Sequence, residues 1–246
     1  MKKRILLTAV ALILVCALSI MGTVAFLQTQ TATVTNTFVA AGGPGPFVDE
    51  VDGVEQFDLK EYEVTQATSG KYTLNNQKEV AANHYNVLPN TTIPKQAFVK
   101  LSRTGKTVTD DNKTTTYTPA PAYLYLEVVD GLNAEHYTWS VNSDWEKLGT
   151  VTDEGKTSDI YLYVGDLADD THVLTTVTAG TKIDIITDNK VTAKNVDLPE
   201  GEFTITFNAY LAQASTGETD DPTAVFNNCF GKTITPVATP APDPAG

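Results

Sequence analysis

The sequence predicts an all-β fold in which short antiparallel strands form a sandwich or barrel. About eight β-prone segments follow one another with turn residues between them. Two of these segments, Tyr123–Val129 and Phe203–Tyr210, alternate apolar and polar residues as half-buried antiparallel strands do. Few helices are expected, since only the segment after Asp221 carries clear helix signals. The pattern is typical of β-sandwiches and β-barrels.

Met1–Ala25 has the parts of a secretory signal peptide. A positive n-region, consisting of Lys2, Lys3 and Arg4, precedes a long apolar run. Thr23 and Ala25 then place small side chains at the two positions that a signal peptidase requires. We therefore expect cleavage before Phe26. The alternative is an uncleaved membrane anchor, because about twenty apolar residues are enough to span a bilayer.

The segment Phe26–Val39 is predicted to form one long strand. Thr dominates its odd positions, and its even positions carry the apolar side chains Phe26, Ala32, Val34 and Phe38. No charged residue occurs between Phe26 and Val48. Because an uncharged strand is a template for edge pairing, we interpret the segment as a polymerisation strand that adds to the sheet of a neighbour. The alternative is that it folds back as an edge strand of its own domain.

Residues 40–46 cannot continue this strand and are predicted to form a hinge. The hinge residues are Gly42, Gly43, Pro44, Gly45 and Pro46. A sandwich domain is expected over residues 47–234. Its predicted strands are Phe57–Thr65, Tyr72–Leu74, Ala97–Arg103, Tyr123–Val129, Tyr137–Val141, Ile160–Val164, Ile183–Ile186 and Phe203–Leu211. The Pro/Ala-rich tail, residues 235–246, is predicted to be disordered.

The best helix candidate is Pro222–Phe230. Asp221 precedes it as an acidic cap, proline occupies its first turn, and Gly231 follows its last residue. Its inward face would consist of Val225, Phe226 and Cys229. Cys229 is the only cysteine left after signal cleavage, so no intramolecular disulfide can form. We interpret Cys229 as a core thiol, with intermolecular cross-linking as the alternative.

Charge and cysteine content restrict the class of protein. Cleavage removes three basic residues and no acid, which leaves 14 Lys and Arg against 30 Asp and Glu, a formal charge of −16. This charge excludes a general nucleic-acid binder, which needs a basic surface. It suits a soluble secreted protein. An exported chain without disulfides is more typical of Gram-positive bacteria than of a eukaryotic secretory route.

The sequence contains no recognisable catalytic motif. There is no H-E-x-x-H and no G-x-S-x-G, and the three histidines, His84, His136 and His172, are isolated in the sequence. Acidic clusters near Asp110, Asp166 and Asp220 could bind calcium, but none matches the twelve-residue calcium loop. Solvated turns and a helix cap explain these clusters better. We therefore expect a protein that is not an enzyme and needs no cofactor or resident metal.

Three segments resemble one family of secreted proteins. Gly22–Leu27 with Thr33–Phe38 resembles the start of the TasA/camelysin-like proteins, which are cut by a SipW-type signal peptidase. Tyr85–Pro94 and Ile205–Ala214 resemble the family's central turn and late core strand, and Pro222–Phe230 is similar to the short helix that often follows. The resemblance implies a jelly-roll-like β-sandwich in the extracellular matrix or at the cell surface.

The chain departs from this family in two places. Gln28–Thr31 stands where family members commonly carry acidic residues, and the hinge interrupts what is usually a direct run into a second strand. The resemblance implies a secreted structural subunit of a biofilm or surface fibre that assembles by donor-strand exchange. Expected partners are further copies of this chain, other matrix or cell-wall components, and the signal peptidase. A camelysin-like surface protease and a monomeric surface adhesin are the alternatives.

Overall fold

The computed structural model describes most of the predicted sandwich domain and little of what precedes it. The described residues are 28–31, 50–51, 54–55, 57–67, 70–110, 113–165, 172–198, 204–215 and 219–237. The predicted signal peptide and hinge lie outside these residues. So do Phe26, Ala32, Val34 and Phe38 of the predicted polymerisation strand. Within the described part of the chain, no helix combines the length and apolar character needed to cross a membrane.

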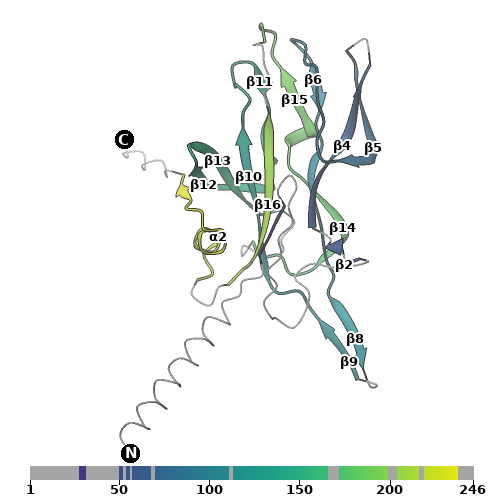
Figure 1. Ribbon diagram of the computed structural model, residues 1–246, viewed down its shortest axis with the longest axis vertical. Helices are drawn as coiled ribbons and strands as arrows, with labels where there is room; N and C mark the ends of the chain where they lie inside the picture. Colours follow the sequence, from purple (N-terminus) through teal and green to yellow (C-terminus); the bar gives the residue numbers. More distant parts are fainter. Residues whose placement is uncertain are drawn as a thin grey trace, which may run out of the picture.

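Three antiparallel sheets make up the body (Figure 1). The largest has six strands in the order β1 (Gln28–Thr31), β16 (Ile205–Gln213), β10 (Ala122–Asp130), β13 (Lys156–Tyr163), β12 (Trp145–Asp153) and β17 (Thr235–Pro236). A four-stranded sheet has the order β14 (Val177–Asp184), β7 (Ala97–Arg103), β4 (Phe57–Gln66) and β5 (Tyr72–Val80). A three-stranded sheet consists of β11 (Tyr137–Thr138), β15 (Lys190–Ala193) and β6 (Thr92–Pro94).

Smaller elements complete the described chain. Two hairpins are β2 (Glu50–Val51) with β3 (Val54–Glu55), and β8 (Lys106–Asp110) with β9 (Lys113–Tyr117). A short 3-10 helix, η1, spans Thr187–Asn189, and the helix α2 spans Pro222–Phe230. Nearly all of the described regular structure is therefore antiparallel strand, and the all-β sandwich predicted from the sequence is confirmed.

The six-stranded sheet is covered on both faces. Alternate residues of β10 point to opposite sides, as the period of a strand requires. Ala122, Leu124, Leu126 and Val128 pack in the core that also contains Val99 and Leu101 of the four-stranded sheet. Tyr123 and Tyr125 of the same strand pack on the other side, with Val225, Phe226 and Cys229 of α2. In Figure 1, α2 accordingly lies on the side of this sheet that faces away from the four-stranded sheet.

The predicted helix is confirmed, together with its caps and its buried face. The Asp221 side chain accepts a hydrogen bond of 2.8 Å from the Ala224 backbone N–H, and Gly231 ends the helix with φ of 65°. A left-handed residue at this position favours glycine because glycine has no Cβ. The predicted inward residues Val225, Phe226 and Cys229 are all buried.

The strand predictions agree in position and differ mainly in length. The predicted strand Ala97–Arg103 has the same bounds as β7, and Phe57–Thr65 lacks only the last residue of β4. The predicted strand Ile183–Ile186 overlaps only the last two residues of β14, which begins at Val177. The sequence analysis did not identify β12, whose residues are mostly polar or small and whose burial is irregular.

The structure differs from the prediction at the start of the tail. Thr235 and Pro236, which we expected to be disordered, form β17 and pair with Thr150 and Gly149 of β12. Buried Ile234 anchors this strand to the core beneath α2. Gly149 permits the close approach, because a Cβ there would lie 2.1 Å from the Thr235 carbonyl oxygen. Residues 238–246 lie outside the described residues.

Gly149→Ala is therefore expected to displace β17 and lower the thermal stability. Each kcal/mol lost should reduce Tm by about 2–4 °C in a protein of this size. The measurement is a calorimetric melt, together with hydrogen exchange at the backbone amides of β12. The matched control is deletion of residues 238–246, which leaves both residues of β17 in place. Equal melting of Gly149→Ala and the parent would show that β17 adds no stability.

Cys229 is expected to be unreactive in the folded protein. Burial raises the pKa of its thiol to about 11, which lowers the thiolate fraction at neutral pH about 100-fold. Ellman's reagent should therefore modify the native protein far more slowly than the urea-unfolded protein. Rapid native labelling, or a disulfide-linked dimer on a non-reducing gel, would favour the intermolecular alternative.

Candidate functional site

Four residues of the predicted polymerisation strand are described, and they pair with β16. In this antiparallel register Gln28 lies opposite Ala212, Thr29 opposite Leu211, Gln30 opposite Tyr210 and Thr31 opposite Ala209. We call the junction of β1 and β16 the seam. In this single chain, β1 is the outermost described strand at one edge of its own six-stranded sheet. This arrangement corresponds to the fold-back alternative that the sequence left open.

The acceptor strand of the seam is regular, uncharged and buried. β16 pairs with β10 over nine consecutive residue pairs without a register shift. Its sequence, ITFNAYLAQ, contains no charged residue and no proline. Residues Ala209 to Ala212, which β1 pairs with, are all buried. A regular strand of this kind exposes a row of backbone N–H and C=O groups when its partner is absent.

The other outer strands of the two large sheets carry features that hinder edge pairing. β5 carries Lys78 and Glu79, and its pairing with β4 shifts register between Tyr62 and Glu63. The pairing of β14 with β7 also shifts register, between Val177 and Thr181. β17 ends at Pro236, which has no N–H to donate. Among the described edge strands of these sheets, β1 is therefore the one without a charge, a register shift or a proline.

A buried carboxylate lies beside the seam, on the α2 face of the sheet. Glu127 of β10 is 4% exposed, and it is the direct cross-strand partner of Asn208. Its Oε1 accepts hydrogen bonds from Ser158 Oγ at 2.7 Å and from Lys232 Nζ at 2.9 Å. Its Oε2 accepts from Tyr210 Oη at 2.5 Å, Asn208 Nδ2 at 3.0 Å and Lys232 Nζ at 2.9 Å. We call these five residues the Glu127 cluster.

The cluster sets the ionisation of its members. Burial alone would raise the pKa of Glu127, but hydrogen bonds from Tyr210, Lys232 and Ser158 outweigh it and hold the pKa below its ordinary value. Burial, followed by the hydrogen bond to Glu127, raises the pKa of the Tyr210 hydroxyl well above its ordinary value. At neutral pH, Glu127 is thus a carboxylate and Tyr210 a neutral donor. Lys232, two residues past the end of α2, ties the helix exit to the sheet.

This cluster is not among the sites predicted from the sequence. Glu127 shares the phase of Tyr123 and Tyr125 in the predicted strand Tyr123–Val129, opposite to the apolar phase of Leu124 and Leu126. A buried charge requires partners, and all four of them are far from Glu127 in the sequence. Only the folded arrangement shows which side chains meet there.

Tyr210→Phe is expected to cost more stability than Tyr125→Phe. The Tyr210 hydroxyl donates to an ionised carboxylate, which is worth about 1.5–3 kcal/mol. Tyr125 is the matched control, because its hydroxyl donates to the neutral Pro222 carbonyl at 2.9 Å, a bond worth about 1 kcal/mol. Urea unfolding of both variants measures the difference. A smaller loss for Tyr210→Phe would show that the cluster tolerates a missing donor.

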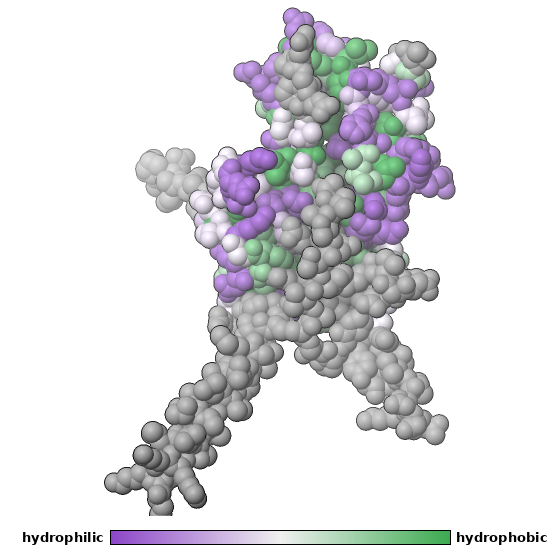
Figure 2. All heavy atoms as spheres, viewed as in Figure 1, coloured by the Kyte–Doolittle hydropathy of each residue, from purple (hydrophilic) through white to green (hydrophobic). Residues whose placement is uncertain are grey.

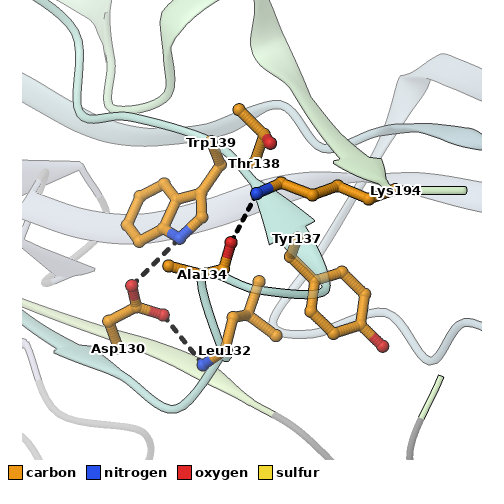
Figure 3. A pocket seen from close by; sticks show the side chains of 7 residues that line it. All are labelled: Asp130, Leu132, Ala134, Tyr137, Thr138, Trp139 and Lys194. Atoms are coloured by element: carbon orange, nitrogen blue, oxygen red, sulfur yellow. Dashed lines mark hydrogen bonds between the residues drawn. The ribbon is translucent and has the colours of Figure 1, made fainter. Parts of the chain in front are cut away.

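A shallow pocket of about 260 Å³ lies at the far end of β10 (Figure 3). Its lining residues are Asp130, Leu132, Ala134, Tyr137, Thr138, Trp139 and Lys194. Asp130 accepts hydrogen bonds from the Trp139 indole N–H at 3.1 Å and the Leu132 backbone N–H at 2.9 Å. Lys194 Nζ donates to the Ala134 carbonyl at 2.6 Å. The Asp130 carboxylate, the Trp139 indole N–H and the Lys194 ammonium are therefore engaged within the wall of the pocket.

The residues weighed for catalysis and metal binding are not brought together. His84 is exposed, while His136 and His172 are half-buried on separate segments. Asp221 caps α2, as predicted for this acidic pair. The clusters near Asp110 and Asp166 lie at or beside residues that are not described. Among the described residues, no group of three or more His, Cys, Asp or Glu could hold a metal ion.

Comparison with known proteins gives no match. A scan against protein-family models found none that matches the chain, and searches of curated proteins and of solved structures found no match either.

Proposed function

We propose that this protein is a secreted structural subunit of a bacterial surface or matrix fibre, assembled by exchange of its N-terminal strand. The observation that carries the proposal is the seam, where an uncharged N-terminal segment pairs with the uncharged, regular edge of β16. Secretion is proposed from the signal-like start of the chain. Membership of the TasA/camelysin-like group remains part of the proposal, and its support is the sequence resemblance.

The seam provides a physical reason for exchange. If β1 leaves its own sheet, the edge of β16 loses its hydrogen-bonding partner over Ala209–Ala212. The same segment of a second copy can restore the pairing with identical contacts, because donor and acceptor are the same two sequences. The free energy of the seam is then nearly equal in both states, and the linker and the protein concentration determine the outcome. The predicted hinge at residues 40–46 would let the strand leave.

The geometry of such a contact favours a filament. One copy donates a strand and another accepts it, so the contact is head-to-tail rather than symmetric. Contacts of this kind propagate when the rotation between subunits does not close a ring. Each subunit would therefore contribute one donor strand and one acceptor edge.

The seam also predicts a register for the donor beyond Thr31. Among the described residues, no strand pairs with Ile205–Asn208 on the side opposite β10. Continuing the observed register would place Ala32 opposite Asn208 and Val34 opposite Thr206. In the proposed fibre the donor thus follows β16 over most of its length. Backbone hydrogen bonds would supply much of the affinity in such a complex.

A disulfide trap distinguishes exchange from fold-back. In a Cys229→Ser background, Gln28→Cys with Ala212→Cys places two thiols at directly opposed positions of the seam. Exchange predicts a ladder of covalent multimers on a non-reducing gel, whereas fold-back predicts a monomer with an internal bond. Gln28→Cys with Ala209→Cys is the matched control, because an offset of three residues, about 10 Å, is too far for a disulfide.

Electron microscopy of the mature protein supplies the second readout. Filaments are expected from the parent, and none from a variant that lacks Phe26–Val39 or carries Val34→Asp with Phe38→Asp. The proposal fails if the trap yields only internally bonded monomers and the parent remains monomeric at high concentration. The strand would then belong to its own sheet alone.

A further inference from the structure

We infer that the Glu127 cluster is the site of an intramolecular isopeptide bond between the side chains of Lys232 and Asn208, formed with Glu127 as the catalytic acid and base. The inference does not depend on the proposed function, since it concerns a single folded chain. It assigns a modification to three side chains that the fold brings together from β10, β16 and the segment after α2.

The first support is the way in which one carboxylate bridges an amine and an amide. Oε2 of Glu127 lies 2.9 Å from Lys232 Nζ and 3.0 Å from Asn208 Nδ2. The amine that would attack and the amide nitrogen that would leave thus contact the same oxygen atom. A side chain that must take a proton from one and give it to the other needs this placement.

The second support is burial. The Glu127 side chain is 6% exposed and the Lys232 side chain 22%. Aromatic rings enclose the site, since Tyr210 packs on Phe226 and Phe230 with ring centroids 5.6 and 4.8 Å apart. In such surroundings a buried carboxylate would exchange protons with the side chains that contact it rather than with bulk water. A neutral lysine is the nucleophilic form.

The groups that face the pair are accounted for. Ser158 Oγ and Tyr210 Oη both donate to the carboxylate, and Tyr210 Oη lies 3.0 Å from Lys232 Nζ. Among the described charged residues, no second cation or carboxylate makes a salt bridge with this pair. Within the described part of the chain, Lys232 is therefore the one charged partner of Glu127.

The chemistry balances without an oxidant or a co-reactant. A proton passes from the Lys232 ammonium to the Glu127 carboxylate, and the free amine attacks Cγ of Asn208 to form a new C–N bond. The attacking nitrogen gives up one further proton, which the carboxyl group relays to Nδ2. The bond between Cγ and Nδ2 then breaks, and ammonia leaves with the proton held by Glu127, as ammonium. Overall, an ammonium and a primary amide become a secondary amide and an ammonium ion.

The location would make the bond useful. It would join β16, the acceptor strand of the seam, to the chain that follows α2, and so close a loop containing the helix. Closing a loop covalently restricts the unfolded chain. After signal cleavage the chain has one cysteine, Cys229, so no disulfide can do this within the molecule.

Peptide mapping tests the inference on the full mature protein. Trypsin followed by cleavage after Glu202 and Glu218 separates Asn208 from Lys232 in the sequence. The expected result is one linked species that joins residues 203–218 to residues 219–246, lighter than the sum of the two fragments by one ammonia. Cleavage by trypsin after Lys232 should be absent, because the acylated side chain is no longer a substrate. Separate fragments of full mass would overturn the inference.

Matched variants test the assigned roles. Glu127→Gln keeps the size of the side chain and one acceptor oxygen but cannot take up the lysine proton, and it should give full-mass, unlinked fragments. Asn208→Ala and Lys232→Arg should do the same, with circular dichroism confirming the fold. A linked species in Glu127→Gln would overturn the catalytic role, and a bond from Lys232 to another residue would overturn the assignment of Asn208.

A second buried pair serves as an internal reference. Lys95 Nζ contacts Glu61 at 2.8 Å, and Glu61 is 4% exposed. The neighbouring amide of Asn83, however, donates to the Tyr62 carbonyl and accepts from the Val64 N–H. Since both of these bonds engage the side-chain amide away from the Glu61 carboxylate, normal tryptic cleavage after Lys95 is expected in the same digest. A link at Lys95 would show that burial alone is sufficient and would overturn the requirement for a bridging carboxylate.

Discussion

The rest of the structure depends on the pairing of β10 with β16. These two strands form the longest uninterrupted ladder in the six-stranded sheet, and both of their faces are buried. One face builds the main core with the four-stranded sheet, and the other receives α2. Hydrophobic burial on two sides makes the ladder rigid. A rigid ladder in turn can present a straight, regular edge to a further strand.

Burial of both faces of the sheet also encloses one charged side chain, that of Glu127, which therefore needs partners. Glu127 lies in the middle of the ladder, where an unpaired charge would be strongly destabilising. The structure meets this requirement with donors from two strands, β13 and β16, and with Lys232, which also fixes the exit of α2. The Glu127 cluster and the seam lie next to each other, because Tyr210 belongs to the cluster and pairs with Gln30 in the seam.

Figure 2 shows that hydrophobic residues on the visible, coloured face lie in small groups among hydrophilic ones.

Local sequence signals predicted the strands and the helix that carry their own patterns. The apolar run of Ala97–Arg103 and the cap, proline and glycine around α2 were sufficient to place both elements. β12 and β17 were missed, since they are stabilised by neighbours: β17 exists because Gly149 leaves room for it and Ile234 anchors it. The Glu127 cluster was unpredictable for the same reason, because Lys232 lies 105 residues from Glu127 in the sequence. The seam was foreseeable as an uncharged strand, but its partner and register were not.

The two edge strands of the six-stranded sheet differ chemically. β1 brings backbone donors and acceptors to one edge, whereas β17 closes the other with two residues, the second of which is Pro236. β17 thus hinders further strand pairing at Gly149 and Thr150 of β12, whereas the β1 edge carries no such feature. In the proposed fibre, strands would therefore be added at one edge of each sheet, and separate folded bodies would be joined through their N-terminal strands.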